Sequence, residues 1–135
     1  MKTIIVLAVS IVLVGILFCP MVMAAPSMPD DLQIVQPDPS LPKELSAFFG
    51  KWESTTNPEK FFVIVEKIDE EKASLYIWFW GSAETPAQIW TRREAQVIKE
   101  GGKYKLWYAS RFGNAVYTLK GEYLIVGNER LRRVP

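Results

Sequence analysis

The sequence predicts an all-β fold, an eight-stranded antiparallel up-and-down barrel, and two observations point to it. Turn signals recur at spacings of about 8–12 residues through the second half of the chain, which is typical of sandwiches and barrels. No stretch after Gly50 has helical periodicity, so the strand–helix–strand crossover that a parallel sheet needs is missing. An open sheet of such apolar strands would expose its edges, and closure into a barrel removes them.

The positions of the turns define the elements. Leu45, Phe48 and Phe49 have i, i+3, i+4 spacing, which predicts one or two helical turns over 42–49, and Gly50 ends them. Seven turn signals then lie at 57–58, 69–71, 81–86, 101–102, 113–114, 121–122 and 127–128. The predicted strands between them are 51–56, 61–68, 73–80, 88–98, 103–111, 115–120, 122–126 and 129–134.

Residues 1–24 have the organisation of a secretory signal peptide. Lys2 is the only charged residue before Asp30, and an apolar run covers residues 4–19. Short side chains follow, as a signal peptidase requires, and we expect cleavage after Ala24. The sequence therefore predicts a secreted or periplasmic protein.

Two other fates of this segment stay open. An uncleaved apolar run would anchor the chain, and the membrane would then be contacted only through the N-terminal segment. Cys19 is a candidate for lipidation, but that chemistry requires a small residue before the cysteine, and here the residue is Phe18.

Residues 25–42 form a proline-rich tether between the signal and the barrel domain of residues 43–135. Prolines favour extended backbone and prevent a stable helix. The composition indicates a disordered spacer in preference to a ligand for a proline-recognition domain. Ile34 and Val35 are the residues of this segment that could dock on the domain.

Composition excludes several functional classes. The chain has 16 basic and 15 acidic residues, no histidine and one cysteine. Nothing in this balance indicates a nucleic-acid partner, and histidine-dependent catalysis and intramolecular disulfides are ruled out. Because no nucleophile motif, phosphate loop or metal-ligand spacing is present, we expect neither an enzyme nor a cofactor or metal site.

The predicted strand 73–80 is rich in aromatic residues and apolar on both faces. Leu75, Ile77 and Phe79 share one face, and Tyr76, Trp78 and Trp80 share the other. Three interpretations of the second face stay open. Its rings fill a small barrel, line a ligand cavity, or form an outward row spaced by about 6.5–7 Å that suits a glycan or a protein partner.

Neighbouring strands contribute polar candidates. Alternation with lysines predicts that Tyr104 and Tyr108 point inward, and Glu66 shares a strand face with apolar residues. In the fourth predicted strand, Trp90 and Arg92 are expected to face water and Arg93 the interior. Since buried charges are seldom unpaired, we expect either an internal Glu66–Arg93 pair, bonded by one of the tyrosines, or side chains that reach a barrel mouth.

The motif Gly50-Lys51-Trp52, just after a short helical turn, resembles the G-x-W signature of lipocalins and related calycin barrels. The resemblance implies that Trp52 closes one barrel end and that an arginine of the last strand crosses its face. Arg130, Arg132 and Arg133 are available, and we assign Arg132 to this contact. The chain departs from the family in its shorter barrel and in lacking the lipocalin cysteines.

The leading functional expectation, which the resemblance implies, is non-catalytic binding of a small apolar or aromatic molecule. The expected ligand-binding residues are Tyr76, Trp78, Trp80, Tyr104, Tyr108, Glu66 and Arg93. The alternatives are a protein or glycan interaction module that uses an exposed aromatic row, and a purely structural domain. The sequence leaves the identity of the ligand and the oligomeric state open.

Overall fold

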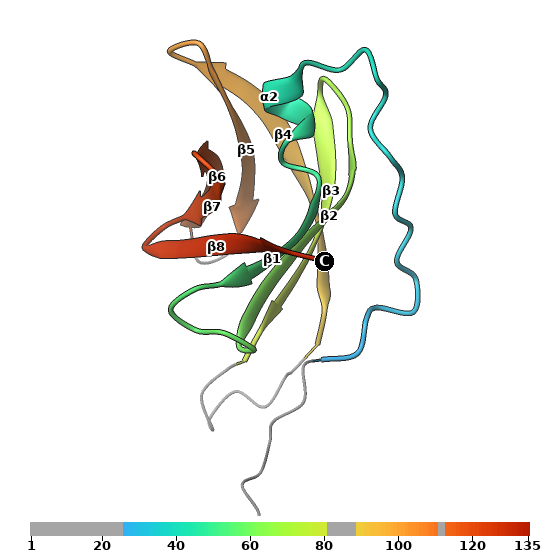
Figure 1. Cartoon of the computed structure of the whole chain (residues 1–135), viewed down its shortest axis with the longest axis vertical. Helices are drawn as coiled ribbons and strands as arrows, with labels where there is room; N and C mark the ends of the chain where they lie inside the picture. The colour runs from blue at the N-terminus through green and yellow to red at the C-terminus, as the bar shows by residue number, and fades with distance from the viewer. Residues whose placement is uncertain (1–25, 81–88, 111–112) are drawn as a thin grey trace, which may run out of the picture.

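One sheet of eight antiparallel strands closes into a barrel in the computed structural model (Figure 1). The structure describes residues 26–80, 89–110 and 113–135. Each strand pairs with the next along the chain, and the first pairs with the last, so the predicted fold class is confirmed. The predicted signal peptide, its cleavage site and Cys19 lie outside the described residues.

The elements agree with the predicted ones in number and order, and differ mainly at their ends. They are α2 (Lys43–Ser46), β1 (Gly50–Ser54), β2 (Phe61–Ile68), β3 (Lys72–Phe79), β4 (Thr91–Glu100), β5 (Lys103–Ser110), β6 (Gly113–Lys120), β7 (Tyr123–Val126) and β8 (Glu129–Val134). Gly113 and Asn114, predicted as a turn, are paired strand residues opposite Ser110 and Ala109.

The barrel centre is filled by side chains. Residues that alternate along the strands make up the interior, among them Val63, Val65, Leu75, Ala95, Leu106, Leu124 and Leu131, all with 0% exposure. Side chains with no accessible surface have no water-sized space beside them. The centre of the barrel is therefore a packed core.

A β-bulge in β2 changes which residues face inward. Val65 pairs with Leu75, and the next pair joins Lys67 to Ser74, so Glu66 is the extra residue. Strict alternation placed Ile68 on the same face as Glu66. The bulge instead turns Ile68 into the core, where it is 5% exposed.

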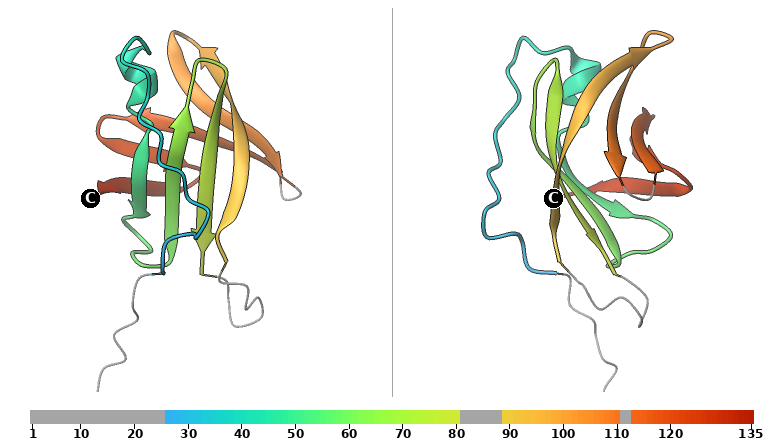
Figure 2. Two further views of the ribbon diagram at one scale, coloured as in Figure 1. Left: turned by 90° about the vertical axis from the view of Figure 1, so that its right-hand side faces the viewer. Right: turned by 180° about the vertical axis from the view of Figure 1, so that it is seen from behind.

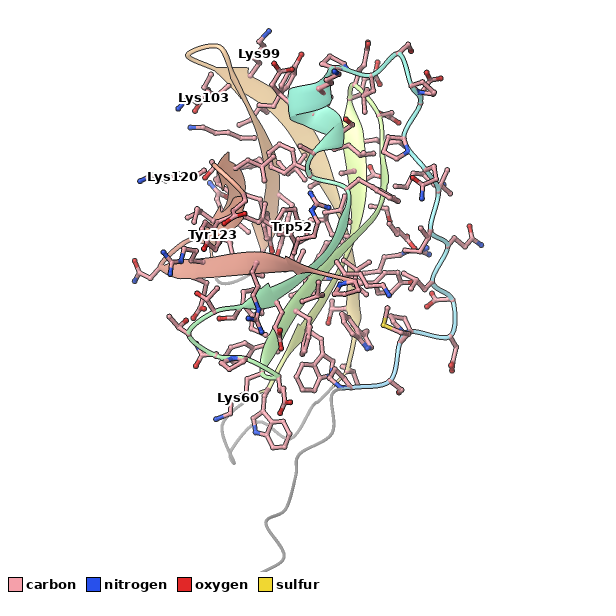
Figure 3. All side chains as sticks on the ribbon, in the orientation of Figure 1. Trp52, Lys60, Lys99, Lys103, Lys120 and Tyr123 are labelled. Carbon is pink, nitrogen blue, oxygen red and sulfur yellow. The ribbon has the colours of Figure 1, made fainter. Side chains whose placement is uncertain are left out.

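The short helix α2 covers one end of the barrel beside Trp52 (Figure 3). The Trp52 ring is 1% exposed, and its indole N–H donates to Phe48 O at 2.9 Å. The guanidinium carbon of Arg133 lies 4.3 Å from the centroid of that ring, and Arg133 also donates to Phe49 O and to Ala47 O.

The arginine that crosses Trp52 is thus Arg133, and the assignment to Arg132 is corrected. The register explains the difference, since Trp52 pairs with Arg133 and Glu53 pairs with Arg132 across β1 and β8. Arg132 accordingly forms an ion pair with Glu53 at 3.1 Å.

Residues 26–37, which we call the strap, run along the outside of β2, β3 and β4 with a turn at 29–32 (Figure 2). The backbone N–H of Val35 donates to Glu66 O at 2.8 Å, and the Trp90 indole donates to Ser27 O at 2.7 Å. The expectation of a disordered spacer is therefore corrected for this part of the tether.

Candidate binding surface on the outside of the barrel

The outward side of β2, β3 and β4, which we call the outer face, carries the aromatic row that the sequence singled out. The register pairs Phe62 with Trp78 and Ile64 with Tyr76, while the flanking Val63 and Leu75 belong to the core. Tyr76 and Trp78 therefore point out of the barrel. Both are nevertheless buried, with exposures of 2% and 4%.

Five rings on the outer face form one aromatic cluster. Its members are Phe62, Tyr76, Trp78, Trp80 and Trp90. Trp78 lies at the centre, with ring centroids 5.9 Å from Phe62, 6.2 Å from Trp80 and 6.4 Å from Trp90. Edge-on and tilted ring pairs at such distances are favourable, so the cluster is a rigid apolar platform.

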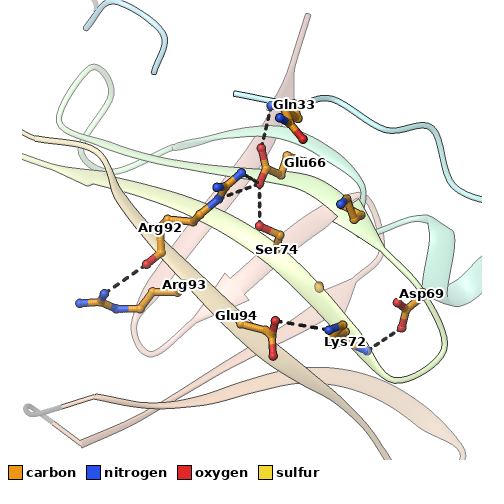
Figure 4. Close-up of a pocket in the computed structure, with 10 residues that line it drawn as sticks. Gln33, Glu66, Asp69, Lys72, Ser74, Arg92, Arg93 and Glu94 are labelled. Carbon is orange, nitrogen blue, oxygen red and sulfur yellow. Dashed lines mark hydrogen bonds and ion pairs between the residues drawn. The ribbon is translucent and has the colours of Figure 1, made fainter. Parts of the chain in front are cut away.

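Glu66 is the buried charge of the outer face, with 1% exposure (Figure 4). Its Oε1 accepts from Ser74 Oγ at 2.6 Å and from Arg92 Nη2 at 2.6 Å, and its Oε2 accepts from the Gln33 backbone N–H at 2.9 Å. Burial raises the pKa of Glu66, but the hydrogen bonds from Ser74, Gln33 and Arg92 together outweigh it and lower that pKa. The carboxylate is therefore held in its charged form.

The ion-pair partner of Glu66 is Arg92, and the expected internal pair with Arg93 is corrected. Arg92 lies opposite Tyr76 in the β3–β4 register, so both project from the outer face, as Glu66 does. Arg93 shares the parity of Ala95 but is exposed, and it donates to its neighbour's backbone carbonyl, Arg92 O, at 3.1 Å.

The strap binds this face mainly through its own backbone. Gln33 N–H and Val35 N–H, two residues apart on an extended segment, both donate to Glu66, one to its carboxylate and one to its carbonyl oxygen. Ser27 O accepts from Trp90. The bulge at Glu66 is what places both acceptors on the outside of the sheet.

One charged strap side chain meets the outer face as well. A carboxylate oxygen of Asp31 lies 3.8 Å from Arg92 Nη1. The Tyr76 hydroxyl and, more weakly, Arg92 lower the pKa of Asp31. Burial and the nearby Asp31 raise the pKa of Tyr76 to about 12, yet the buried hydroxyl makes no hydrogen bond of normal geometry.

Two hollows adjoin the strap. An open pocket of about 450 Å³ is lined by Glu66, Ser74, Arg92 and Glu94 among others, with Gln33 of the strap at its edge (Figure 4). An apolar crevice of about 160 Å³ lies between the strap and β2, lined among others by Met28, Phe62 and Trp90. The strap thus leaves a polar hollow and a small apolar one uncovered.

The predicted ligand-binding residues are not brought together at one site. Tyr104 and Tyr108 pack against the barrel core, on the side opposite to Tyr76 and Trp78. Tyr108 stacks on Tyr117 with ring centroids 6.1 Å apart. Lys99 Nζ lies 5.0 Å from the centroid of the Tyr104 ring.

Sequence reasoning missed four contributors to the outer face. Trp90 and Arg92 were interpreted as solvent-facing, and Asp31 and Gln33 as part of a spacer. Arg92 and Trp90 do face outward, but the strap covers their side of the sheet. The signal that could have identified Arg92 is its parity with Trp90, which places both on one face of β4 beside the aromatic row.

Among the described residues, no three metal-binding side chains of the His, Cys, Asp or Glu types come together. No helix in the described ranges is long and apolar enough to cross a membrane. A scan against protein-family models, a search of curated proteins and a search of solved structures each found no match to this chain.

Proposed function

We propose that this protein is an exported, non-catalytic module that binds an extended polypeptide on the outer face of β2, β3 and β4. The signal-like organisation of residues 1–24 supports export. The aromatic cluster and the buried Glu66 support binding, because they combine a rigid apolar platform with a fixed acceptor for backbone amides.

The observation that carries the proposal is the way in which the strap is held. Gln33 N–H, Val35 N–H and Ser27 O are backbone groups, which every polypeptide except at proline can present. Binding that relies on backbone hydrogen bonds takes its affinity from the main chain and its specificity from a few side-chain contacts. The outer face therefore has the features of a polypeptide-binding surface.

A polypeptide fits this face better than a glycan or a small molecule. Tyr76 and Trp78 are 2% and 4% exposed and pack against the neighbouring Phe62 and Trp90 rings, so their faces are not open to stack on sugar rings. The apolar crevice of about 160 Å³ is below the ~300 Å³ at which ligand pockets usually begin. The hollow of about 450 Å³ is large enough, but it is open and lined almost entirely by polar and charged residues, whereas ligand pockets are mainly apolar. The barrel centre is packed with side chains that have no accessible surface.

The geometry of Glu66 supports a binding role in preference to catalysis. Its two carboxylate oxygens accept from Ser74, Arg92 and the Gln33 amide, which together hold it ionised. A general acid or base needs a pKa near the working pH and a free position for the transferred proton. Glu66 therefore acts as a fixed acceptor for an amide.

The proposal is tested by selecting displayed dodecapeptides on the processed protein. The selected peptides should lose binding to Trp90→Ala and keep it with Trp107→Ala, a tryptophan of β5 that belongs neither to the aromatic cluster nor to the strap contacts described above. Peptides that bind both variants equally would contradict the proposal. So would a selection without enrichment on both the wild-type protein and Val35→Pro, a variant in which the strap loses the amide that donates to Glu66 O.

A second candidate is the binding of a small aromatic acid at the Trp52 end of the barrel. A pocket of about 640 Å³, within the usual range for ligand sites, is lined there by Trp52, Tyr123, Arg132 and Arg133 among others. The Tyr123 ring would contact the ligand and the arginines would pair with its carboxylate. Native mass spectrometry of protein from the host's secreted fraction tests it through an added mass that is lost on denaturation.

Membership of the lipocalin-like barrels is part of this second proposal. The arrangement of Gly50, Trp52 and Arg133 supports it, because a Cβ at Gly50 would lie 2.6 Å from Arg133 Nη1. Gly50 also has φ +121°, which a residue with a side chain rarely adopts. A glycine at this position thus lets Arg133 reach Phe49 O and Ala47 O, just after α2.

A further inference from the structure

We propose that the strap is a displaceable occupant of the outer face, and that the partner which replaces it is an extended peptide with an acidic side chain in the place of Asp31. This inference rests on the proposed polypeptide-binding function. It adds the chemistry of the partner and a mechanism by which the protein's own chain limits access.

Three apolar side chains of the strap stay substantially exposed. Met28, Ile34 and Val35 are 40%, 45% and 44% exposed. Burial of apolar surface is the main source of affinity in most docked segments, at about 25 cal/mol per Å². A segment that leaves these side chains in water is held chiefly by its backbone and by Asp31, and it can be exchanged for another segment with the same features.

The strap contacts that recur along the chain define what a partner must supply. Asp31 lies in the turn at 29–32 and reaches Arg92, and Gln33 and Val35 follow on extended backbone, so the N–H groups of these two residues face the same strip of the sheet. The first supplies a carboxylate and the other two supply N–H groups. A partner therefore needs an acidic residue followed, two and four residues later, by residues other than proline.

Asp31 only partly satisfies the hydrogen-bond donors that face its carboxylate. Arg92 uses Nε and Nη2 on Glu66, which leaves Nη1 directed to Asp31 at the long distance of 3.8 Å. The neighbouring Tyr76 hydroxyl, with its residue 2% exposed, makes no hydrogen bond of normal geometry. A carboxylate that approached more closely would pair with Arg92 and accept from Tyr76, and this would satisfy a buried polar group.

Because the strap is covalently attached, it competes at a high effective concentration, in the millimolar range for a short connection. Peptide added in solution is therefore expected to bind the wild-type protein weakly. Weakening the strap without touching the barrel should tighten that binding.

The test uses protein produced with its own residues 1–24 and purified in its processed form. The probe is a fluorescent dodecapeptide with the sequence of residues 26–37. A control probe has the same sequence with Asp31→Asn. Val35→Pro removes the strap amide that donates to Glu66 O. Gln36→Pro is the matched control, because among the described residues the Gln36 amide makes no hydrogen bond to the barrel. Asp31→Asn in the protein is a second variant that weakens the strap, through the loss of the ion pair with Arg92.

Fluorescence anisotropy should show that Val35→Pro binds the probe about fivefold more tightly than wild type or Gln36→Pro, as expected for one lost hydrogen bond. Asp31→Asn in the protein should act in the same direction. The probe that carries Asp31→Asn should bind Val35→Pro about threefold more weakly than the unmodified probe.

The failures are distinguishable. If all protein variants bind the probe equally, the strap is not a competitor and the inference is overturned, while the proposed function stands. If both probes bind equally, the acidic specificity is overturned. If no variant binds either probe, or if Trp90→Ala leaves binding unchanged, the proposed function itself fails.

Discussion

Glu66 and Arg92 meet on the outside of the barrel, with Arg92 Nη2 2.6 Å from Glu66 Oε1. The Glu66 side chain is 1% exposed and the Arg92 side chain 46% exposed, so the pair joins a buried acceptor to a cation at the surface. Because Glu66 also accepts the Gln33 amide, the pair stabilises the strap on the sheet.

The attachment of the strap should weaken in acid. The pKa of Glu66 is lowered below its ordinary 4.5, so its stabilising contribution is fully present above about pH 4.5 and is lost as the pH falls through the lower folded pKa. We expect Glu66→Gln to cost about 1–2 kcal/mol of unfolding free energy at pH 7, since Arg92 can return to water. Urea unfolding at pH 7 and at pH 3 measures the loss.

Other carboxylates with lowered pKa values, such as Asp31 and Glu129, titrate in the same range. The difference between wild type and Glu66→Gln isolates Glu66, because those groups are common to both proteins. That difference should shrink from pH 7 to pH 3. A difference that stays constant over this range would contradict the role assigned to the charge.

Arg133→Ala should destabilise the barrel by about 1–2 kcal/mol, because it removes the stack on Trp52 and the donors to Phe49 O and Ala47 O. Arg130→Ala is the matched control, since Arg130 lies 4.6 Å from the Tyr123 ring centroid. We expect a loss below about 1 kcal/mol there. Thermal unfolding of both variants measures this, and equal losses would contradict the account of the barrel end.

Gly50→Ala should act through Arg133. The added Cβ would meet Arg133 Nη1 at 2.6 Å and force that side chain off Trp52. In a double-mutant cycle, Gly50→Ala should therefore cost less in the Arg133→Ala background than in wild type. Gly101→Ala is the control, because Gly101 also has a positive φ, 56°, but a Cβ added there would have no atom within 4 Å. The free energy of unfolding that Gly101→Ala costs should be the same in both backgrounds.

Tyr76 should ionise late in an alkaline titration. Burial and Asp31 raise its pKa to about 12, so the neutral phenol adds stability below pH 10 that is lost as the pH rises toward 12. Absorbance at the phenolate band should show a component near pH 12 that Tyr76→Phe removes. Tyr104→Phe is the matched control for the loss of a tyrosine, and a component that persists in Tyr76→Phe would argue against a covered outer face.

The strands were predictable because their limits are set by local chemistry. Gly101-Gly102 and Gly127-Asn128 mark hairpin turns that the structure places between β4 and β5 and between β7 and β8. The bulge at Glu66 was not predictable, because β2 alternates without an interruption and its extra residue depends on the partner strand. Consequently strict alternation places Ile68 on the wrong face.

The two arginine corrections have a common cause. The register between strands decides which residue of β8 lies beside Trp52 and which residue of β4 lies beside Glu66. The register is a property of paired strands and is not written in either strand alone. The sequence alone predicts that an arginine contacts Trp52 and that an arginine pairs with Glu66. The register between strands decides that these are Arg133 and Arg92.

The strap was interpreted as a spacer because its attachment has no side-chain signature. Gln33 and Val35 bind through N–H groups that any non-proline residue has, and the prolines around them favour extended backbone with or without a binding partner. Asp31 is the exception, yet one acidic residue in a polar tether gives no indication that it faces an arginine.

Hydrogen exchange of the strap amides tests the central claim most directly. In the processed protein at neutral pH, the amides of Gln33 and Val35 should exchange more slowly than that of Gln36, because Glu66 accepts from the first two. NMR resolves all three amides in one experiment, with Gln36 as the internal reference. Exchange of Gln33 and Val35 at the rate of Gln36 would contradict the docking of the strap on the outer face.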